Sequence, residues 1–202
     1  MKTLALELST ALGSVAWLGA DGASTVRKFP ADRKHSGLFY ENLSDLCRDC
    51  GLPEVIVVGL GPGSYAGVRI AIATALGLRI ASSARLLGLP SICAFDCARY
   101  CVIGDARRSS YFFARVQDGN CIEGPCLLSE EELQAKLDDQ CAVAVFASQP
   151  LPQFARVETM HPSAVLLAAL AQKSDLRSDE PLEPIYLRTP YITTPKTIPW
   201  IR

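Results

Sequence analysis

The feature that most constrains the fold is a short apolar run, Val55–Val58, that leads directly into a glycine-rich loop. Four successive β-branched residues are typical of a strand that is buried on both faces, as in the middle of a parallel sheet. The loop at residues 59–64 reads Gly-Leu-Gly-Pro-Gly-Ser, and a stretch rich in Ala, Ile and Leu follows it to Ser82. This stretch predicts a helix that is apolar on nearly every side and must be buried on several faces. A strand, a tight loop and such a helix in succession predict an α/β protein.

The residues before this unit predict an antiparallel meander of strands at Thr3–Leu8, Ser14–Leu18 and Ala23–Phe29. Turn-forming residues separate the three runs, as is typical of hairpins. A helix should follow, because apolar residues then recur at helical intervals up to Gly51, which occupies the position after a helix end where glycine is favoured. These apolar residues are Leu38, Phe39, Leu43 and Leu46.

The rest of the chain predicts a second, smaller lobe. The N-terminal lobe should cover residues 1–100 and end with a strand at Leu86–Leu89 and a short cysteine-containing helix to about Tyr100. The C-terminal lobe, residues 101–202, should carry an extended, proline-rich tail from Glu180 that can pack back on the first lobe. No internal repeat is evident in the sequence. The elements expected in the second lobe are strands at Tyr111–Gln117, Cys121–Glu123 and Ala142–Phe146, a helix with a capping box at Ser129 and Glu132, and a helix at Val165–Ala171.

Composition excludes two classes of protein. The formal net charge is −1, whereas a dedicated nucleic-acid binder usually carries a clear excess of Lys and Arg. Any contact with RNA should therefore be shared with a partner. The N-terminus has neither the apolar core nor the cleavage site of a signal peptide, and no apolar run approaches the roughly 20 residues that span a bilayer. We expect a cytoplasmic protein.

The eight cysteines predict core packing more than metal or redox chemistry. Cys47 and Cys50 have CxxC spacing, but they fall at the end of a predicted helix, where the helix dipole does not lower a thiol pKa. Cys93, Cys97 and Cys101 recur every four residues, which would line one face of a helix. Buried free cysteines behave as small hydrophobic residues and produce the same pattern.

The glycine-rich loop formally fits the dinucleotide fingerprint GxGxxA over Gly61–Ala66. Against that interpretation, no acidic residue that could bind a ribose occurs between Gly67 and Phe95. The loop is not a Walker A motif, and Ser64 lacks the glycines of a nucleophile elbow. Two interpretations stay open: backbone amides that hold an anion at the helix start, or a tight turn that needs glycine for close packing. The candidate residues for an anion or nucleotide are Gly61, Gly63, Ser64 and Gly67.

Residues suited to acid–base or metal chemistry are few. The two histidines, His35 and His161, are far apart, and neither has an assignable carboxylate partner for a hydrolytic triad. Glu7 ends the first predicted strand, where sheets of this type collect ligands. Asp105–Arg108 forms a second charged point at a strand–loop junction. Ion-paired surface groups are the alternative interpretation for both. No metal site and no catalytic residue are predicted.

Several stretches together resemble the TsaB (YeaZ) family, and the resemblance spans essentially the whole chain. The most specific part is Gly59–Ala73, which is close to the family's Gly-Pro-Gly-Ser-Phe-Thr-Gly-Leu-Arg-Ile-Gly signature. The other stretches are Thr3–Thr10 with Gly13–Ala16, His35–Ser36, Asp105–Arg108 with Tyr111, and the closing Pro184–Arg188.

The resemblance implies an actin/Hsp70/sugar-kinase type of fold with two related lobes, and a non-catalytic role. TsaB is the partner of TsaD, which carries the metal and the active site. With TsaE they transfer a threonylcarbamoyl group from its adenylate to N6 of the adenosine next to the anticodon. The resemblance implies that the chain contacts tRNA only through the complex and that the free chain can form a homodimer. It implies no specific cofactor, although a nucleotide could bind at the interface with TsaD. It assigns partner binding to the first two helices, here His35, Ser36, Leu38, Phe39, Asn42, Leu46, Arg69, Ala71, Thr74 and Leu78.

The chain departs from the family pattern at a few positions. Glu7 and Leu8 stand where the family has Asp and Thr, which leaves Glu7 as a candidate vestigial phosphate or metal site. Ser109 and Ser110 replace Gly and Glu. A TsaD-like enzyme would carry paired histidines on the first helix, whereas this sequence has His35 alone.

Two functions other than a scaffold subunit have less support in the sequence. A stand-alone ATP-dependent enzyme or kinase of the same fold would need a carboxylate for Mg²⁺ and a second phosphate loop. Glu7 could supply the carboxylate, but no second loop is evident. A peptidase would need a nucleophile–base pair or a metal site, and the sequence offers neither.

Overall fold

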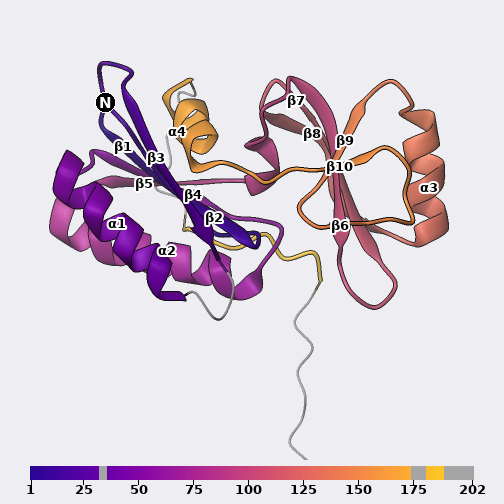
Figure 1. Cartoon of the computed structure of the whole chain (residues 1–202), viewed down its shortest axis with the longest axis horizontal. Helices are drawn as coiled ribbons and strands as arrows, with labels where there is room; N and C mark the ends of the chain where they lie inside the picture. The colour runs from indigo at the N-terminus through magenta and orange to yellow at the C-terminus, as the bar shows by residue number, and fades with distance from the viewer. Residues whose placement is uncertain (32–35, 174–180, 189–202) are drawn as a thin grey trace, which may run out of the picture.

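The computed structural model describes residues 1–31, 36–173 and 181–188, and these form two lobes side by side (Figure 1). The first lobe contains a five-stranded sheet in the order β3-β2-β1-β4-β5. β1 pairs antiparallel with β2 and parallel with β4, so the sheet is mixed. Its strands are β1 (Thr3–Glu7), β2 (Leu12–Leu18), β3 (Ser24–Pro30), β4 (Val55–Gly59) and β5 (Arg85–Leu89). The predicted meander and the predicted central strand are confirmed.

The second sheet repeats the topology of the first. Its order, β10-β9-β6-β7-β8, is that of the first sheet read from the opposite edge. In both lobes an antiparallel meander is followed by two strands that pair in parallel. The sequence does not reveal this repeat, because topology can persist without residue similarity. The strands are β6 (Arg99–Asp105), β7 (Tyr111–Gln117), β8 (Asn120–Leu128), β9 (Ala144–Ala147) and β10 (Val157–Thr159).

Helices cover both faces of the first sheet. α1 (Ser36–Cys50) and α2 (Tyr65–Ser82) pack on one face, and α4 (Ala164–Lys173) packs on the other (Figure 1). In the second lobe α3 (Glu130–Asp139) takes the place of α1 between the meander and the parallel strands, and its predicted capping box is present. Residues 148–156 between β9 and β10 form turns where the first lobe has α2. The second lobe is smaller for this reason.

The placement of α4 corrects the predicted boundary near residue 100. That boundary assigned α4 to the second lobe, but its apolar side is buried against the first sheet. Burial of small residues on both partners allows this close packing. The first lobe is therefore built from both ends of the chain. The buried residues of this contact are Ala164, Leu167, Ala168 and Ala171 of α4 and Ala5, Ala16, Val55 and Val57 of the sheet.

The predicted cysteine-containing helix up to Tyr100 is wrong. A short 3-10 helix covers only Ser91–Cys93, and β6 already begins at Arg99. Cys101 lies within this strand, so the four-residue spacing of the cysteines does not mark a helix face. The packing interpretation of Cys93 is supported, because burial raises the pKa of its thiol to about 11 and keeps it protonated and unreactive.

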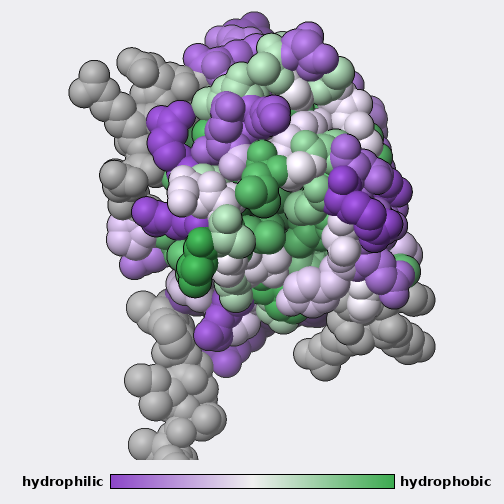
Figure 2. Space-filling model, turned by 90° about the vertical axis from the view of Figure 1, so that its left-hand side faces the viewer, coloured by the Kyte–Doolittle hydropathy of each residue, from purple (hydrophilic) through white to green (hydrophobic). Residues whose placement is uncertain are grey.

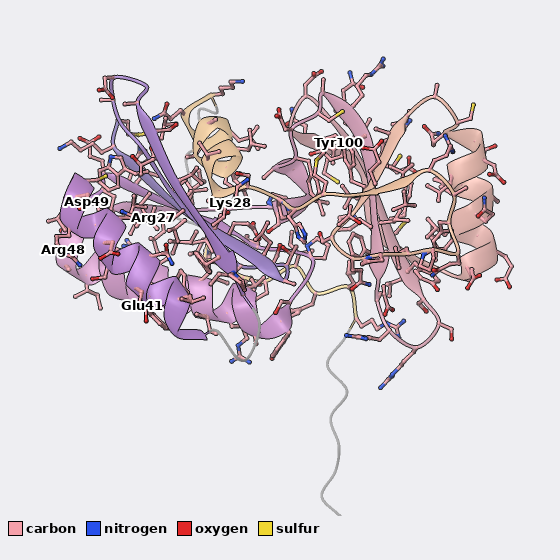
Figure 3. All side chains as sticks on the ribbon, viewed as in Figure 1. Arg27, Lys28, Glu41, Arg48, Asp49 and Tyr100 are labelled. Atoms are coloured by element: carbon pink, nitrogen blue, oxygen red, sulfur yellow. The ribbon has the colours of Figure 1, made fainter. Side chains whose placement is uncertain are left out.

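Figure 3 shows two features that tie elements together. On the surface of the first lobe, Arg27 of β3 and Asp49 of α1 form an ion pair at 3.0 Å. Such an exposed pair contributes little to stability. In the second lobe the Tyr100 ring is buried next to Phe95 and Phe146, and its hydroxyl donates to the Ile92 carbonyl at 2.9 Å. This contact fastens β6 to the chain that enters it from the first lobe.

Candidate functional site

The glycine-rich loop packs directly on the turn between β1 and β2. A Cβ atom on Gly63 would overlap the Ser9 carbonyl oxygen, and one on Gly67 would overlap the Leu8 carbonyl oxygen. The Ser64 amide donates to the same Ser9 carbonyl at 2.6 Å. Glycine is needed here because two backbones approach more closely than a side chain permits.

The amides of this loop are largely engaged within the protein. Gly61 donates to the Ser91 hydroxyl at 3.0 Å, and Gly67 donates to the Ser64 hydroxyl at 3.2 Å. Ser64 is thus the N-cap of α2. The Leu8 and Ser9 carbonyls lie against the start of α2, and their partial negative charge opposes an anion there. This geometry gives the glycines a sufficient packing role, while anion binding at Gly61, Gly63, Ser64 and Gly67 stays a prediction.

Glu7 ends β1 beneath this loop and is fully buried, so it is not an ion-paired surface group. Its Oε1 atom accepts the Ser9 amide at 2.6 Å, whereas Oε2 has no hydrogen-bond partner among the described residues. The carboxyl group fills the space that a side chain at Gly59 would occupy. Burial raises the pKa of Glu7, and its Ser9 and Ser91 neighbours counteract that rise only in part. A vestigial phosphate or metal role for Glu7 stays a prediction.

Asp105 occupies the position in the second lobe that Glu7 occupies in the first. It ends β6, and its Oδ1 atom accepts the Arg107 amide at 2.6 Å, again two residues ahead. Its Oδ2 atom lies 3.6 Å from the Arg107 guanidinium. One carboxyl group is therefore buried and the other is paired with arginine, so the two do not form an open carboxylate pair for Mg²⁺. Within the described ranges, no three His, Cys, Asp or Glu residues are grouped as metal ligands.

A cleft of about 1090 Å³ separates the two lobes. The β1–β2 turn and the glycine-rich loop form one wall, and the end of β6 with its following loop forms the other. Residues 184–188 also line it. Its lining is mainly hydrophobic, with Arg107 and Arg188 among the charged residues. Glu7 is not part of the lining.

The structure places the predicted partner-binding residues on different sides of α1 and α2. Phe39, Leu46 and Ala71 are buried in the protein's own core, so a partner cannot reach them in the folded chain. The prediction is corrected for these three residues: helical spacing identifies an apolar face but not which body covers it. Ser36 begins α1, and His35 lies outside the described residues. Leu38, Asn42, Thr74 and Leu78 are half-buried, and Arg69 is exposed.

Arg69 belongs to a small exposed group at the start of α2. Its guanidinium donates to the Tyr65 hydroxyl at 2.7 Å and lies over the Tyr65 ring, 5.1 Å from the ring centre. The Tyr65 ring also contacts Tyr186, with ring centres 5.6 Å apart. Arg69 is thus held in place on the surface.

The outer face of α2 carries apolar residues that the sequence did not single out. Ile80 is 88% exposed and Leu76 is 47% exposed, and Ile70 lies on the same helix. Leu76 and Ile80 are four residues apart and lie on one stripe of the helix, and this spacing was visible in the sequence. Figure 2 looks onto the free end of the first lobe, where α1 and α2 end, and shows hydrophobic residues gathered near the middle of this face with hydrophilic residues around them.

α2 is also the one helix among the described residues that is long and apolar enough to cross a membrane by length and composition. However, Val68, Ala71 and Ala75 are buried against the sheet of a β4–α2–β5 unit. The helix is apolar on two sides, and the sheet accounts for only one of them.

Comparisons with known proteins identify the family. The family model described as TsaD, tRNA N6-adenosine threonylcarbamoyltransferase, matches residues 30–171. Uncharacterized protein ML0378 of Mycobacterium leprae (strain TN) is 31% identical over 210 residues, which cover 93% of this chain and 55% of the relative. Uncharacterized protein Rv3421c of Mycobacterium tuberculosis (strain ATCC 25618 / H37Rv) is 34% identical over 148 residues, which cover 68% of this chain and 65% of the relative. The chain thus spans less than two thirds of the length of these curated relatives.

Two solved structures from Pseudomonas aeruginosa share the fold over nearly their whole length. YeaZ superposes with a TM-score of 0.72 at 24% identity, over 92% of this chain and 99% of that chain. A protein described as uncharacterized with similarity to peptidase YEAZ gives 0.74 at 24% identity, over 93% and 99%. The expected α/β fold with two related lobes is confirmed. The chain therefore belongs to the TsaD family of this model, and it shares the fold of YeaZ over nearly its whole length.

Proposed function

We propose that this chain is a non-catalytic partner subunit of a TsaD-type enzyme in tRNA threonylcarbamoylation. The observation that carries the proposal is the outer stripe of α2, which leaves apolar side chains exposed on a helix whose other side already packs on the sheet. A surface of this kind on a soluble protein marks an association site. The family also suggests that the complex includes TsaE, that it modifies the adenosine next to the anticodon of tRNA, and that the chain is cytoplasmic. These points are part of the proposal.

Gly77 lies on the same stripe and supports a close helix–helix contact. A Cβ atom at this position would meet no atom within 4 Å, so the packing of the chain itself gives no reason for glycine. Glycine in a helix interior costs about 1 kcal/mol relative to alanine. Ala73, Gly77 and Ala81 follow at intervals of four residues, which places three small residues on one line of the helix. A partner helix could approach α2 closely along this line.

The carboxyl groups support an accessory role over catalysis. Glu7 is enclosed beneath the glycine-rich loop, so it is not an open ligand for a metal–nucleotide complex, and Asp105 already accepts the Arg107 amide and lies next to the Arg107 guanidinium. The net charge of −1 supports tRNA binding through the partner. The alternative is a stand-alone ATP-dependent enzyme, and the observation that favours it is the interlobe cleft, which could hold a small ligand.

Reconstitution of tRNA threonylcarbamoylation with the cognate TsaD and TsaE tests the proposal. Modification should require this chain, while the chain alone should neither hydrolyse ATP nor modify tRNA. Modification that proceeds equally well without the chain would contradict the proposal. ATP hydrolysis by the isolated chain would favour the stand-alone enzyme, and a dimer of the chain that persists in excess TsaD would assign the α2 stripe to a second copy.

Replacing Gly77 by alanine should stabilise the isolated chain but weaken its binding to TsaD. We expect the free energy of unfolding of the isolated chain to rise by about 0.5–1 kcal/mol, because alanine is the better helix former. Binding to TsaD should weaken, because the added methyl group holds the two helices apart. Urea unfolding and calorimetric titration with TsaD measure the two effects. A stabilised variant with unchanged affinity would show that the close approach does not occur at Gly77.

A further inference from the structure

The described C-terminal segment, residues 181–188, connects the two lobes without forming part of either sheet. We call it the crossing segment. On the first lobe, Leu182 packs against the hydrophobic core at Gly88, and the Ile185 amide donates to the Leu60 carbonyl at 2.9 Å. The Tyr186 ring contacts Tyr65 at the start of α2. These contacts hold the crossing segment beside the glycine-rich loop.

The far end of the crossing segment reaches the second lobe. Arg188 Nη2 donates to the Arg107 carbonyl at 3.1 Å. Arg107, Arg108 and Ser109 all have positive φ angles, between 53° and 66°. Left-handed backbone is unfavourable for residues other than glycine, so this loop depends on its hydrogen bonds to keep its shape. The backbone bonds within the loop include Ala106 amide to Ser110 carbonyl at 2.9 Å and Ser110 amide to Arg107 carbonyl at 3.2 Å.

The chain itself crosses between the lobes at a different place. Residues 90–98 lead from β5 to β6, and residues 160–163 lead back to α4. The two crossings are bonded to each other, because the Ser163 amide donates to the Ala94 carbonyl at 2.9 Å. In Figure 1 both crossings run above the yellow crossing segment. Two adjacent covalent connections form a natural hinge, and a non-covalent link away from them fixes the hinge angle.

We propose that the crossing segment is a latch that holds the two lobes closed over the interlobe cleft. Docked, it forms part of the cleft lining and ties the glycine-rich loop of the first lobe to the 105–110 loop of the second. Released, it frees the lobes to rotate about the paired crossings and opens the cleft to solvent. The latch is a property of the chain by itself and does not depend on the proposed partner.

Hydrogen exchange on the isolated full chain tests the latch. Replacing Arg188 by alanine removes the bond to the second lobe, and exchange at the Ala106 and Ser110 amides should become about tenfold faster, the effect of losing one charged hydrogen bond. Tyr186→Ala removes one of the contacts that hold the other end on the first lobe, and it should act on these amides in the same direction. Small-angle scattering of both variants should show a larger radius of gyration than that of the parent.

Two matched variants control the experiment. Arg107→Ala keeps the backbone carbonyl that Arg188 binds, and Tyr186→Phe keeps the ring contact with Tyr65, so both should exchange and scatter like the parent. The proposal is overturned if Arg188→Ala and Tyr186→Ala accelerate exchange within residues 181–188 alone, with the 105–110 loop and the radius of gyration unchanged. The crossing segment would then be a surface tail that does not control the lobes.

Discussion

Replacing Ile80 by glutamate should abolish binding to TsaD while leaving the isolated chain folded. Ile80 is almost fully exposed in the free chain, so a charge there has water around it and costs the fold little. In a complex through the α2 stripe the same carboxylate would be desolvated without a partner. That penalty is about 3–5 kcal/mol, which corresponds to a loss of affinity of at least a hundredfold. Calorimetric titration with TsaD measures the loss, and thermal unfolding checks the fold.

The second lobe offers a matched control for this substitution. Ile122 on β8 is 49% exposed and is also a large aliphatic residue on the surface. Ile122→Glu should change neither the affinity for TsaD nor the unfolding midpoint by more than a small amount. If Ile80→Glu binds TsaD as well as Ile122→Glu does, the α2 stripe is not the partner surface and the proposed mode of binding is wrong.

The second large effect is expected at Glu7. Replacing Glu7 by glutamine should raise the free energy of unfolding at neutral pH by about 1–3 kcal/mol, because the parent must either desolvate a carboxylate or bind a proton when it folds. Glutamine keeps the shape of the side chain and the acceptor for the Ser9 amide, but it carries no charge to desolvate. Urea unfolding at neutral pH measures the difference.

The pH dependence of stability tests independently whether Glu7 destabilises the folded chain at neutral pH. Burial raises the pKa of Glu7 in the folded chain above its ordinary value of 4.5, so the folded state holds a proton that the unfolded state releases. The contribution of Glu7 to stability is therefore complete below the ordinary value and is lost as the pH rises through the raised folded value. Glu7→Gln should remove this decline. A Glu7→Gln variant that is less stable than the parent at neutral pH would show that Glu7 is ionised and paired.

Local sequence pattern was sufficient for much of the fold. The β-branched run at Val55–Val58, the helix that follows the glycine-rich loop and the capping box at Ser129 each depend on residues close in sequence, and each is confirmed. Local pattern failed between Cys93 and Tyr100, where a four-residue spacing suggested a helix and a strand begins instead. The apolar run of β6 packs between two neighbouring strands, and those neighbours come from distant parts of the chain.

For the candidate site, too, some features follow from the sequence and others only from the tertiary structure. The sequence by itself singled out the glycine-rich loop, Glu7 and the first two helices as candidates, and its motifs indicated the family. Only the tertiary structure decided that Glu7 is enclosed, that Asp105 is its counterpart in a repeated lobe, and that Ala71 faces the core while Ile80 faces solvent. The physical reason is that a helix apolar on two sides gives no local signal for which side the sheet covers. That choice is made by packing between segments far apart in the sequence.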